Sequence, residues 1–125
     1  MLHPRCVGWG EIGLDYKNNS IKPEIQHLVF AQQLRHAVKL GKPITIHTRE
    51  AEEDTERILK AEVPIEHPVR CLYFESASLR LFYSQIHVHC YTDGPELALR
   101  LLEHFPNLYF GITGTHFPQY HVRSD

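Results

Sequence analysis

Short apolar segments alternate with amphipathic helical segments along this chain, and this alternation is the feature that most limits how it can fold. Segments with the length and composition of strands occur at residues 7–15, 44–47, 86–91 and 108–113. Helical periodicity occurs at residues 23–40, 51–60 and 93–105. Four strands that alternate with three helices are most economically arranged as a parallel sheet with helices packed on it. We therefore expect an α/β fold.

The first two helical segments also indicate which of their sides should be buried. The first is expected to begin at Pro23 and to end at Gly41, because these residues suit a first helical turn and a C-terminal cap. Its expected apolar side consists of Ile25, Leu28, Phe30, Leu34, Ala37 and Val38. Thr48 is expected to cap the second helix. The expected buried side of that helix consists of Thr55, Ile58 and Leu59.

Length and charge exclude several classes of protein. The 125 residues, 42% of them hydrophobic, are enough for one core and predict a single domain over residues 1–125. A net charge of −2 without a Lys/Arg block excludes a passive nucleic-acid binder, so nucleic acid would need another positive charge, such as a metal ion. No apolar run approaches the roughly 18 residues of a membrane span. Three cysteines without CxxC spacing, and no secretory signal, predict an intracellular protein, cytoplasmic or nuclear.

Two segments do not fit the alternation of strands and helices. Residues 66–85 are rich in aromatic and apolar side chains, yet they stand where a connection of about 2–6 residues is usual. Residues 115–125 follow the last expected strand without a helix to cover it. We expect the first segment to be an insertion outside the sheet and the second to leave an open edge. Exposed aromatic residues and open edges also predict self-association.

Glu11 lies within the first expected strand, which its apolar residues predict to be buried, and His47 and His89 lie at the ends of two later strands. Taken singly, a structural ion pair for Glu11 and an ordinary core or loop position for either histidine are reasonable interpretations. Taken together, their spacings each fit one βαβ step of roughly 30 or more residues, which would return all three to one end of the sheet. A carboxylate and two imidazoles form the donor set of a divalent metal site. Such a site suits hydrolysis, because the ion can lower the pKa of its water toward ~7.

Arg49 and Asp15 are close to these residues in the sequence, and each has two interpretations. Arg49 could clamp a phosphate with its guanidinium group, or it could form an ion pair with Glu50 or Glu53. Asp15 could reach the metal pocket, or it could cap the loop after its strand.

The strand expected at residues 86–91 should alternate between two faces. Ile86, Val88 and Cys90 are expected on one face, and His87, His89 and Tyr91 on the other. His87 could therefore join His89 in a metal motif, or it could pack against the insertion. Cys90 could be a thiolate ligand, although a small buried residue is the simpler interpretation. The remaining histidines are expected to be solvated: His3, His27, His36, His67, His104, His116 and His121.

Four motifs follow one another in a recognisable order. They are GEIGLDY at residues 10–16, KPITIHTREA at 42–51, HCYTD at 89–93 and GITG at 111–114. Together they resemble the TatD family of metal-dependent deoxyribonucleases, over about residues 7–65 and 86–114. The family has a TIM-like (β/α) barrel. The resemblance therefore implies a partial barrel with parallel strands, about half of a complete one, interrupted by the insertion and followed by the non-matching tail.

The resemblance also implies an activity and a site. A divalent metal ion, Zn, Mg or Mn, would be held at the C-terminal ends of the strands and would activate water against a phosphodiester bond of DNA. Glu11 would be a catalytic and metal-bridging carboxylate. His47 and His89 would be metal ligands, and Arg49 would belong to the catalytic pocket. The implied function is that of a hydrolase, a metal-dependent DNase.

Two parts of the family pattern are missing from this chain. No His-x-His pair precedes Glu11, and no Glu-Thr-Asp strand follows the last motif. The three remaining ligands can hold one ion at most, so we expect weak metal binding and DNA hydrolysis far below that of a complete relative. The chain is thus expected to be a truncated member of the family. The alternative function is that of a non-catalytic fragment that acts through association.

Overall fold

A four-stranded parallel sheet forms the centre of the molecule. The structure is a computed structural model that describes residues 3, 5–17, 20–69, 82–83 and 86–113. Its elements are β1 (Trp9–Asp15), α1 (Pro23–Leu40), β2 (Ile44–Arg49), α2 (Glu52–Glu62), β3 (Pro68–Val69), β4 (Phe82–Tyr83), β5 (Ile86–Tyr91), α3 (Pro95–His104) and β6 (Leu108–Ile112). The sheet has the order β1-β2-β5-β6, and all three of its strand pairs are parallel. The predicted α/β fold is confirmed.

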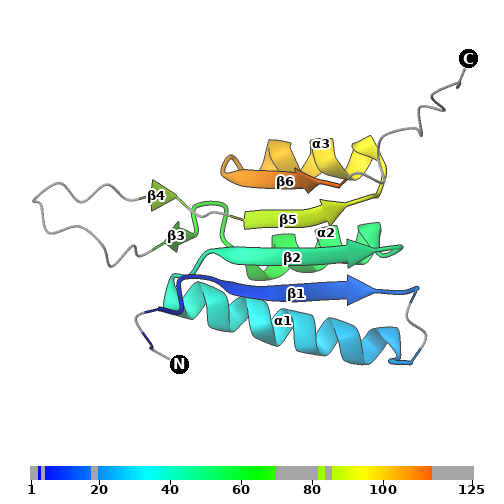
Figure 1. Cartoon of the computed structure of the whole chain (residues 1–125), viewed down its shortest axis with the longest axis horizontal. Helices are drawn as coiled ribbons and strands as arrows, with labels where there is room; N and C mark the ends of the chain where they lie inside the picture. Colours follow the sequence, from blue (N-terminus) through cyan, green and yellow to red (C-terminus); the bar gives the residue numbers. More distant parts are fainter. Residues whose placement is uncertain (1–2, 4, 18–19, 70–81, 84–85, 114–125) are drawn as a thin grey trace, which may run out of the picture.

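The three long helices lie on one side of this sheet, and the C-terminal ends of its strands point the same way (Figure 1). This arrangement follows from the strand order, because right-handed crossovers between successive neighbours place every helix on the same face. All four strands therefore end at a common edge. Side chains from the ends of β1, β2 and β5 can meet there.

Helix α1 has the ends that the sequence predicts. Pro23 occupies its first turn, and Gly41 caps its C-terminus in the left-handed conformation (φ 59°, ψ 42°), which glycine adopts without a steric penalty. Phe30, Leu34 and Ala37 are buried, as predicted.

No helix in the described part of the chain is long and apolar enough to cross a membrane.

The core lies between the sheet and the helices. Its fully buried large apolar side chains are Leu14, Phe30, Leu34, Ile44, Ile46, Leu59, Ile86, Val88, Leu101 and Phe105. Burial of one such side chain contributes about 1.5–3 kcal/mol to stability before conformational entropy is counted. Thr55, Ile58 and Leu59 of α2 are buried as predicted. The core thus fixes the strands from which the site residues project.

The apolar side predicted for α1 is wrong at its N-terminal end. Ile25 and Leu28 are about half exposed, and so is Val29. Periodicity places Ile25 and Leu28 on the apolar side of the helix, but the described residues of the chain provide nothing that covers them. They extend an exposed apolar surface along α1.

The alternation predicted for residues 86–91 is wrong at its end. The pairing of β5 with β6 shifts register between Val88 and Tyr91, and Cys90 has a positive φ of 49°. This bulge turns Cys90 outward and buries Tyr91, the reverse of the prediction. His89 keeps its predicted side, facing the cluster described below.

Two smaller predictions about polar side chains are also wrong. Thr48 does not cap α2; it is buried, and its hydroxyl lies 3.0 Å from the hydroxyl of Thr55. His67 is fully buried rather than solvated, and its Nε2 lies 3.1 Å from the carbonyl oxygen of Lys42. Thr48 and Nε2 of His67 thus have polar partners in the core, whereas Nδ1 of His67 is buried without a hydrogen-bond partner among the described residues.

The segment predicted to be an insertion, residues 66–85, is described only at its two ends. Those ends form β3 and β4, which pair antiparallel in a sheet of their own, apart from the four-stranded sheet (Figure 1). Residues 70–81 and 84–85 lie outside the described residues, as does the tail at 115–125.

Candidate metal centre

Glu11, His47 and His89 meet at one place on the sheet, as predicted, although Glu11 lies four residues before the end of β1 rather than at that end. Oε1 of Glu11 lies 3.1 Å from Nδ1 of His47 and 2.8 Å from Nε2 of His89. The ligand atoms of all three residues lie within 4.8 Å of one another. Three neighbouring strands, β1, β2 and β5, each provide one of them. That they bind a metal ion remains a prediction.

Gly13 allows β1 to approach β2 closely at this point. Its Cα pairs with that of His47, and a Cβ atom at residue 13 would lie 1.7 Å from the His47 carbonyl oxygen. No side chain can therefore be accommodated at this position without moving the strands apart. The second glycine of the GEIGLDY motif, Gly13, thus has a local structural role: it lets the strand that carries Glu11 lie against His47.

His89 has a nitrogen atom suited to a metal ion. Its Nε2 is buried and has no hydrogen-bond partner among the described residues, even though Oε1 of Glu11 is only 2.8 Å away. Buried imidazole nitrogens are normally satisfied, so one that faces a carboxylate without a hydrogen bond needs an explanation. A shared divalent ion would satisfy both groups, because neutral imidazole and carboxylate are both metal ligands. The residues therefore fit the ion that the donor set predicts.

The environment of Glu11 differs from the prediction. The sequence places this carboxylate inside a buried strand, whereas its side chain is 48% exposed. The reason is that β1 is an edge strand of the described sheet, with only Leu14 fully buried. An open cleft of about 540 Å³ lies beside it, lined in part by Glu11, Asp15, Gln26 and His47. The cluster is thus accessible from solvent on the side of β1.

Arg49 and Asp15 lie at the same edge of the sheet, on paired positions of β2 and β1. Within the described ranges, Arg49 is exposed and forms no ion pair with Glu50 or Glu53. Its backbone oxygen accepts a hydrogen bond from the N–H of Tyr16. Asp15 faces the cluster: its Oδ2 lies 3.7 Å from Nε2 of His47.

His87 and Cys90 lie near His89 without joining the three-residue cluster. The ring of His87 is tilted against that of His89, with centroids 6.5 Å apart. The space beside it depends on Gly111, where a Cβ atom would lie 2.7 Å from Nε2 of His87. Cys90 is turned outward by the bulge. Among the described residues, the compact ligand group consists of Glu11, His47 and His89 alone.

A second group of polar side chains, which sequence reasoning missed, lies next to the first. The hydroxyl of Tyr16 donates a 2.6 Å hydrogen bond to Oδ2 of Asp54, and it also contacts Nε2 of His27. Arg57 holds the other oxygen of Asp54 at 2.5 Å. Burial, followed by the hydrogen bond to Asp54, raises the pKa of Tyr16, and the same bond together with Arg57 lowers the pKa of Asp54. We call Tyr16, His27, Asp54 and Arg57 the tyrosine cluster.

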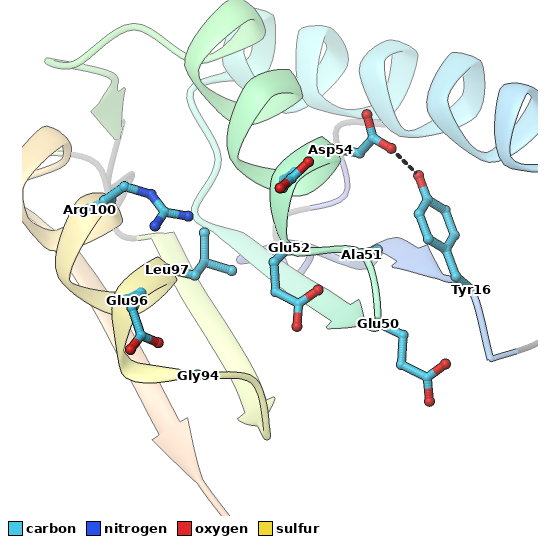
Figure 2. Close-up of a pocket in the computed structure, with 10 residues that line it drawn as sticks. Tyr16, Glu50, Ala51, Glu52, Asp54, Gly94, Glu96, Leu97 and Arg100 are labelled. Atoms are coloured by element: carbon cyan, nitrogen blue, oxygen red, sulfur yellow. Dashed lines mark hydrogen bonds between the residues drawn. The ribbon is translucent and has the colours of Figure 1, made fainter.

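An acidic cleft of about 460 Å³ separates the N-terminal ends of α2 and α3. Figure 2 shows Glu50, Glu52 and Glu96 around it, with Asp54 and Tyr16 at one side. Arg100, on the opposite side, is paired with Glu56 through a 2.7 Å contact. A cleft with this charge does not suit a phosphate group.

Asp93 was also missed by sequence reasoning. It follows β5, and its Oδ2 is buried without a hydrogen-bond partner among the described residues. Burial and the nearby charge of Glu52 raise the pKa of Asp93, while hydrogen bonds from the Thr48 side chain and the Glu50 backbone oppose the shift. The HCYTD motif contains this aspartate, but the motif alone does not indicate how deeply it is buried.

Ligand-type side chains at the C-terminal edge of a parallel α/β sheet define a broad class of proteins whose chemistry takes place at that edge. A family model described as TatD related DNase matches residues 1–124 of this chain. The chain belongs to that family.

Two curated relatives are similar over most of this chain. The human protein named 3'-5' RNA nuclease TATDN2 is 39% identical over 114 residues, which cover 90% of this chain and 13% of that protein. The 3'-5' ssDNA/RNA exonuclease TatD of Erwinia tasmaniensis is 37% identical over 112 residues, which cover 89% of this chain and 36% of that protein. The chain therefore spans well under half the length of either relative.

A solved structure shows the same fold. The crystal structure of an uncharacterized amidohydrolase from Saccharomyces cerevisiae superimposes with a TM-score of 0.62 and 28% sequence identity. The match covers 82% of this chain and 32% of that one. The prediction of a partial TIM-like barrel agrees with this match and with the four parallel strands.

Proposed function

We propose that Glu11, His47 and His89 form a divalent metal site through which this chain takes part in hydrolysing phosphodiester bonds of DNA. The observation that carries the proposal is their convergence from three strands, with ligand atoms within 4.8 Å of one another. The bound ion would polarise a phosphoryl oxygen and acidify a water molecule. The names of the two relatives, an RNA nuclease and an ssDNA/RNA exonuclease, support a nucleic-acid substrate.

The residues of the chain would have distinct roles in this function. Glu11 lies between the two imidazoles and is open to solvent on its other side, which suits a carboxylate that both holds the ion and faces the substrate. His47 and His89 would donate neutral nitrogen atoms. Arg49 is exposed at the same edge, and in the described part of the chain it forms no ion pair with its neighbouring glutamates. It is therefore available to contact a phosphate.

The approach of the substrate follows from the charges around the edge. The acidic cleft between α2 and α3 would repel a phosphodiester backbone. The cleft beside β1 is lined by apolar residues of α1 and by two members of the cluster, Glu11 and His47. We therefore propose that DNA reaches the cluster from the side of β1. The described residues supply ligands for one ion, so the expected rate is far below that of a site with two ions, because a second ion would help to stabilise the leaving oxygen.

The proposal is tested by metal titration and by cleavage of single-stranded DNA, with a Glu11→Gln variant beside the natural chain. We expect zinc or manganese to bind and slow, metal-dependent cleavage that the variant lacks. Comparing the cleavage rate of an RNA of the same sequence with that of the DNA decides whether DNA is preferred. Equal cleavage by the natural chain and the variant would reject the site.

A non-catalytic role through self-association is the second candidate. It is favoured by the exposed apolar residues Ile25, Leu28 and Val29 along α1. Sedimentation of the natural chain and of an Ile25→Ser/Leu28→Ser variant tests it. Association that the variant loses would support this role, and a monomer at all concentrations would reject it.

A further inference from the structure

We infer that Asp15 is a positioning residue for the metal site, holding the ring of His47 so that Nδ1 is the nitrogen offered to the ion. The inference rests on the proposed function, since it takes Glu11, His47 and His89 as the ligands. It goes further by assigning the bound nitrogen of His47 and the residue that selects it.

The two nitrogens of His47 face two different carboxylates. Nδ1 lies 3.1 Å from Oε1 of Glu11, on the side where His89 also contacts that oxygen. Nε2 lies on the opposite side of the ring, 3.7 Å from Oδ2 of Asp15. Only Nδ1 therefore points into the group of ligand atoms. Nε2 points out of it, toward a carboxylate that does not belong to the group.

This arrangement matches the chemical requirement for a ligating histidine. An imidazole that binds a metal ion is neutral, so the one proton it keeps must be on the other nitrogen. Ligating histidines usually donate this N–H to a carboxylate, a carbonyl oxygen or a water molecule, which fixes the ring and increases its basicity. Asp15 is in place for that role. Its separation of 3.7 Å exceeds a direct hydrogen bond, and a small rotation of either side chain would close it.

The backbone of Asp15 is held firmly by α1. The side-chain amide of Gln26 accepts a 2.9 Å hydrogen bond from the Asp15 N–H and donates a 3.1 Å bond to the Asp15 carbonyl oxygen. The same amide donates to the carbonyl oxygen of Ile21. The backbone that carries the Asp15 carboxylate is thus held by Gln26 of α1.

The first measurement needs no metal ion. Nitrogen-15 spectra of histidine, recorded at a pH where the His47 ring is neutral, report which nitrogen carries the proton. We expect an Asp15→Ala variant to contain less of the Nε2–H form than the natural chain, because the proton then moves to Nδ1, beside Glu11. An unchanged ratio of the two forms would overturn the inference, whether or not the chain binds metal.

The second measurement is zinc titration followed by the same spectra. In the natural chain we expect zinc on Nδ1 of His47 and a retained Nε2–H. Asp15→Ala should bind zinc about 10–100-fold more weakly, as outer partners of metal ligands generally do when removed. Asp15→Asn should recover part of that loss, since its amide oxygen still accepts an N–H. Glu103→Gln, which alters an exposed carboxylate on α3, serves as the matched control.

The outcomes separate this inference from the proposed function. Zinc affinity in Asp15→Ala equal to that of the natural chain would overturn the positioning role. A loss of zinc affinity in Asp15→Asn as large as that in Glu11→Gln would also overturn the positioning role, because Asp15 would then be a ligand. If the natural chain binds no zinc, the proposed function fails, and the metal-free spectra still decide the role of Asp15.

Discussion

The candidate metal centre and the tyrosine cluster are neighbours, and both combine imidazole with carboxylate, but they differ in how far their polar groups are satisfied. In the tyrosine cluster, Asp54 receives the hydroxyl of Tyr16 on one oxygen and the guanidinium of Arg57 on the other. In the metal centre, Nε2 of His89 has no hydrogen-bond partner among the described residues. One group is complete without a ligand, and the other is not.

The difference shows that residue type alone does not identify a site. Nε2 of His27 and Oδ2 of Asp54 are 3.3 Å apart, as close as many ligand pairs, yet the Tyr16 hydroxyl contacts both atoms and Arg57 of α2 supplies a cation. Such a network ties elements together. Glu11, in contrast, has two imidazoles beside it and an exposed side, so it can receive an ion from solvent. Unsatisfied geometry is the better indicator of function.

The largest effect should come from removing a carboxylate from each group in turn. Glu11→Gln should weaken zinc binding more than about 100-fold, because even an outer partner of a ligand is worth about 10–100-fold. Asp54→Asn should leave zinc binding unchanged. Isothermal titration of both variants measures the contrast, and equal losses would show that the two groups form one site.

The stability gained from the ion should distinguish the same groups. At a zinc concentration 100 times the dissociation constant, binding should stabilise the natural chain by about 2.7 kcal/mol. A Tyr16→Phe variant should keep this gain, whereas His89→Ala should lose it. Thermal unfolding with and without zinc measures the gain, and a loss in Tyr16→Phe would contradict the separation of the two groups.

A smaller effect is expected from the tyrosine hydroxyl in the absence of metal. Tyr16→Phe removes a hydrogen bond to a charged carboxylate and should cost about 1–2 kcal/mol of unfolding free energy, reduced by the partial exposure of the cluster. Urea unfolding at neutral pH measures the loss. Tyr109→Phe, in an exposed residue of β6, is the matched control and should change little. Equal stability of the two variants would show that the network does not stabilise the fold.

The smallest effect is the pH dependence of that contribution. The hydroxyl of Tyr16 and the charge of Arg57 lower the pKa of Asp54 from its ordinary value of 3.8. A carboxylate with a lowered folded-state pKa contributes stability that is complete above the unfolded value and is lost as pH falls through the folded one. The difference in unfolding free energy between the natural chain and Tyr16→Phe should therefore shrink at strongly acidic pH. A difference that grows on acidification would contradict this sign.

The convergence of Glu11, His47 and His89 could be predicted from the sequence because it depends on one general rule. In a parallel sheet with sequential crossovers, the end of every strand reaches the same edge. The rule needs only strand positions, which the apolar segments indicate well. It does not depend on the rotamer of any side chain.

The misses concern information that local sequence does not contain. The contact of Asp54 with Tyr16 depends on how α2 packs beside β1. The exposure of Cys90 depends on a bulge where β5 meets β6. The exposure of Ile25 and Leu28 depends on what covers α1. Periodicity shows only that these residues share the apolar side of the helix. Each of these is set by tertiary packing.

The distribution of the three ligands over β1, β2 and β5 has a consequence for local motion. An ion held by all of them would join an edge strand to a strand two positions away, across β2. Opening of β1 away from the sheet would then require breaking a metal bond as well as backbone hydrogen bonds. Amide hydrogen exchange in β1 should accordingly slow on zinc binding, while exchange in α3, which carries no ligand, should slow far less. The ion would thus set how often the edge of this sheet opens.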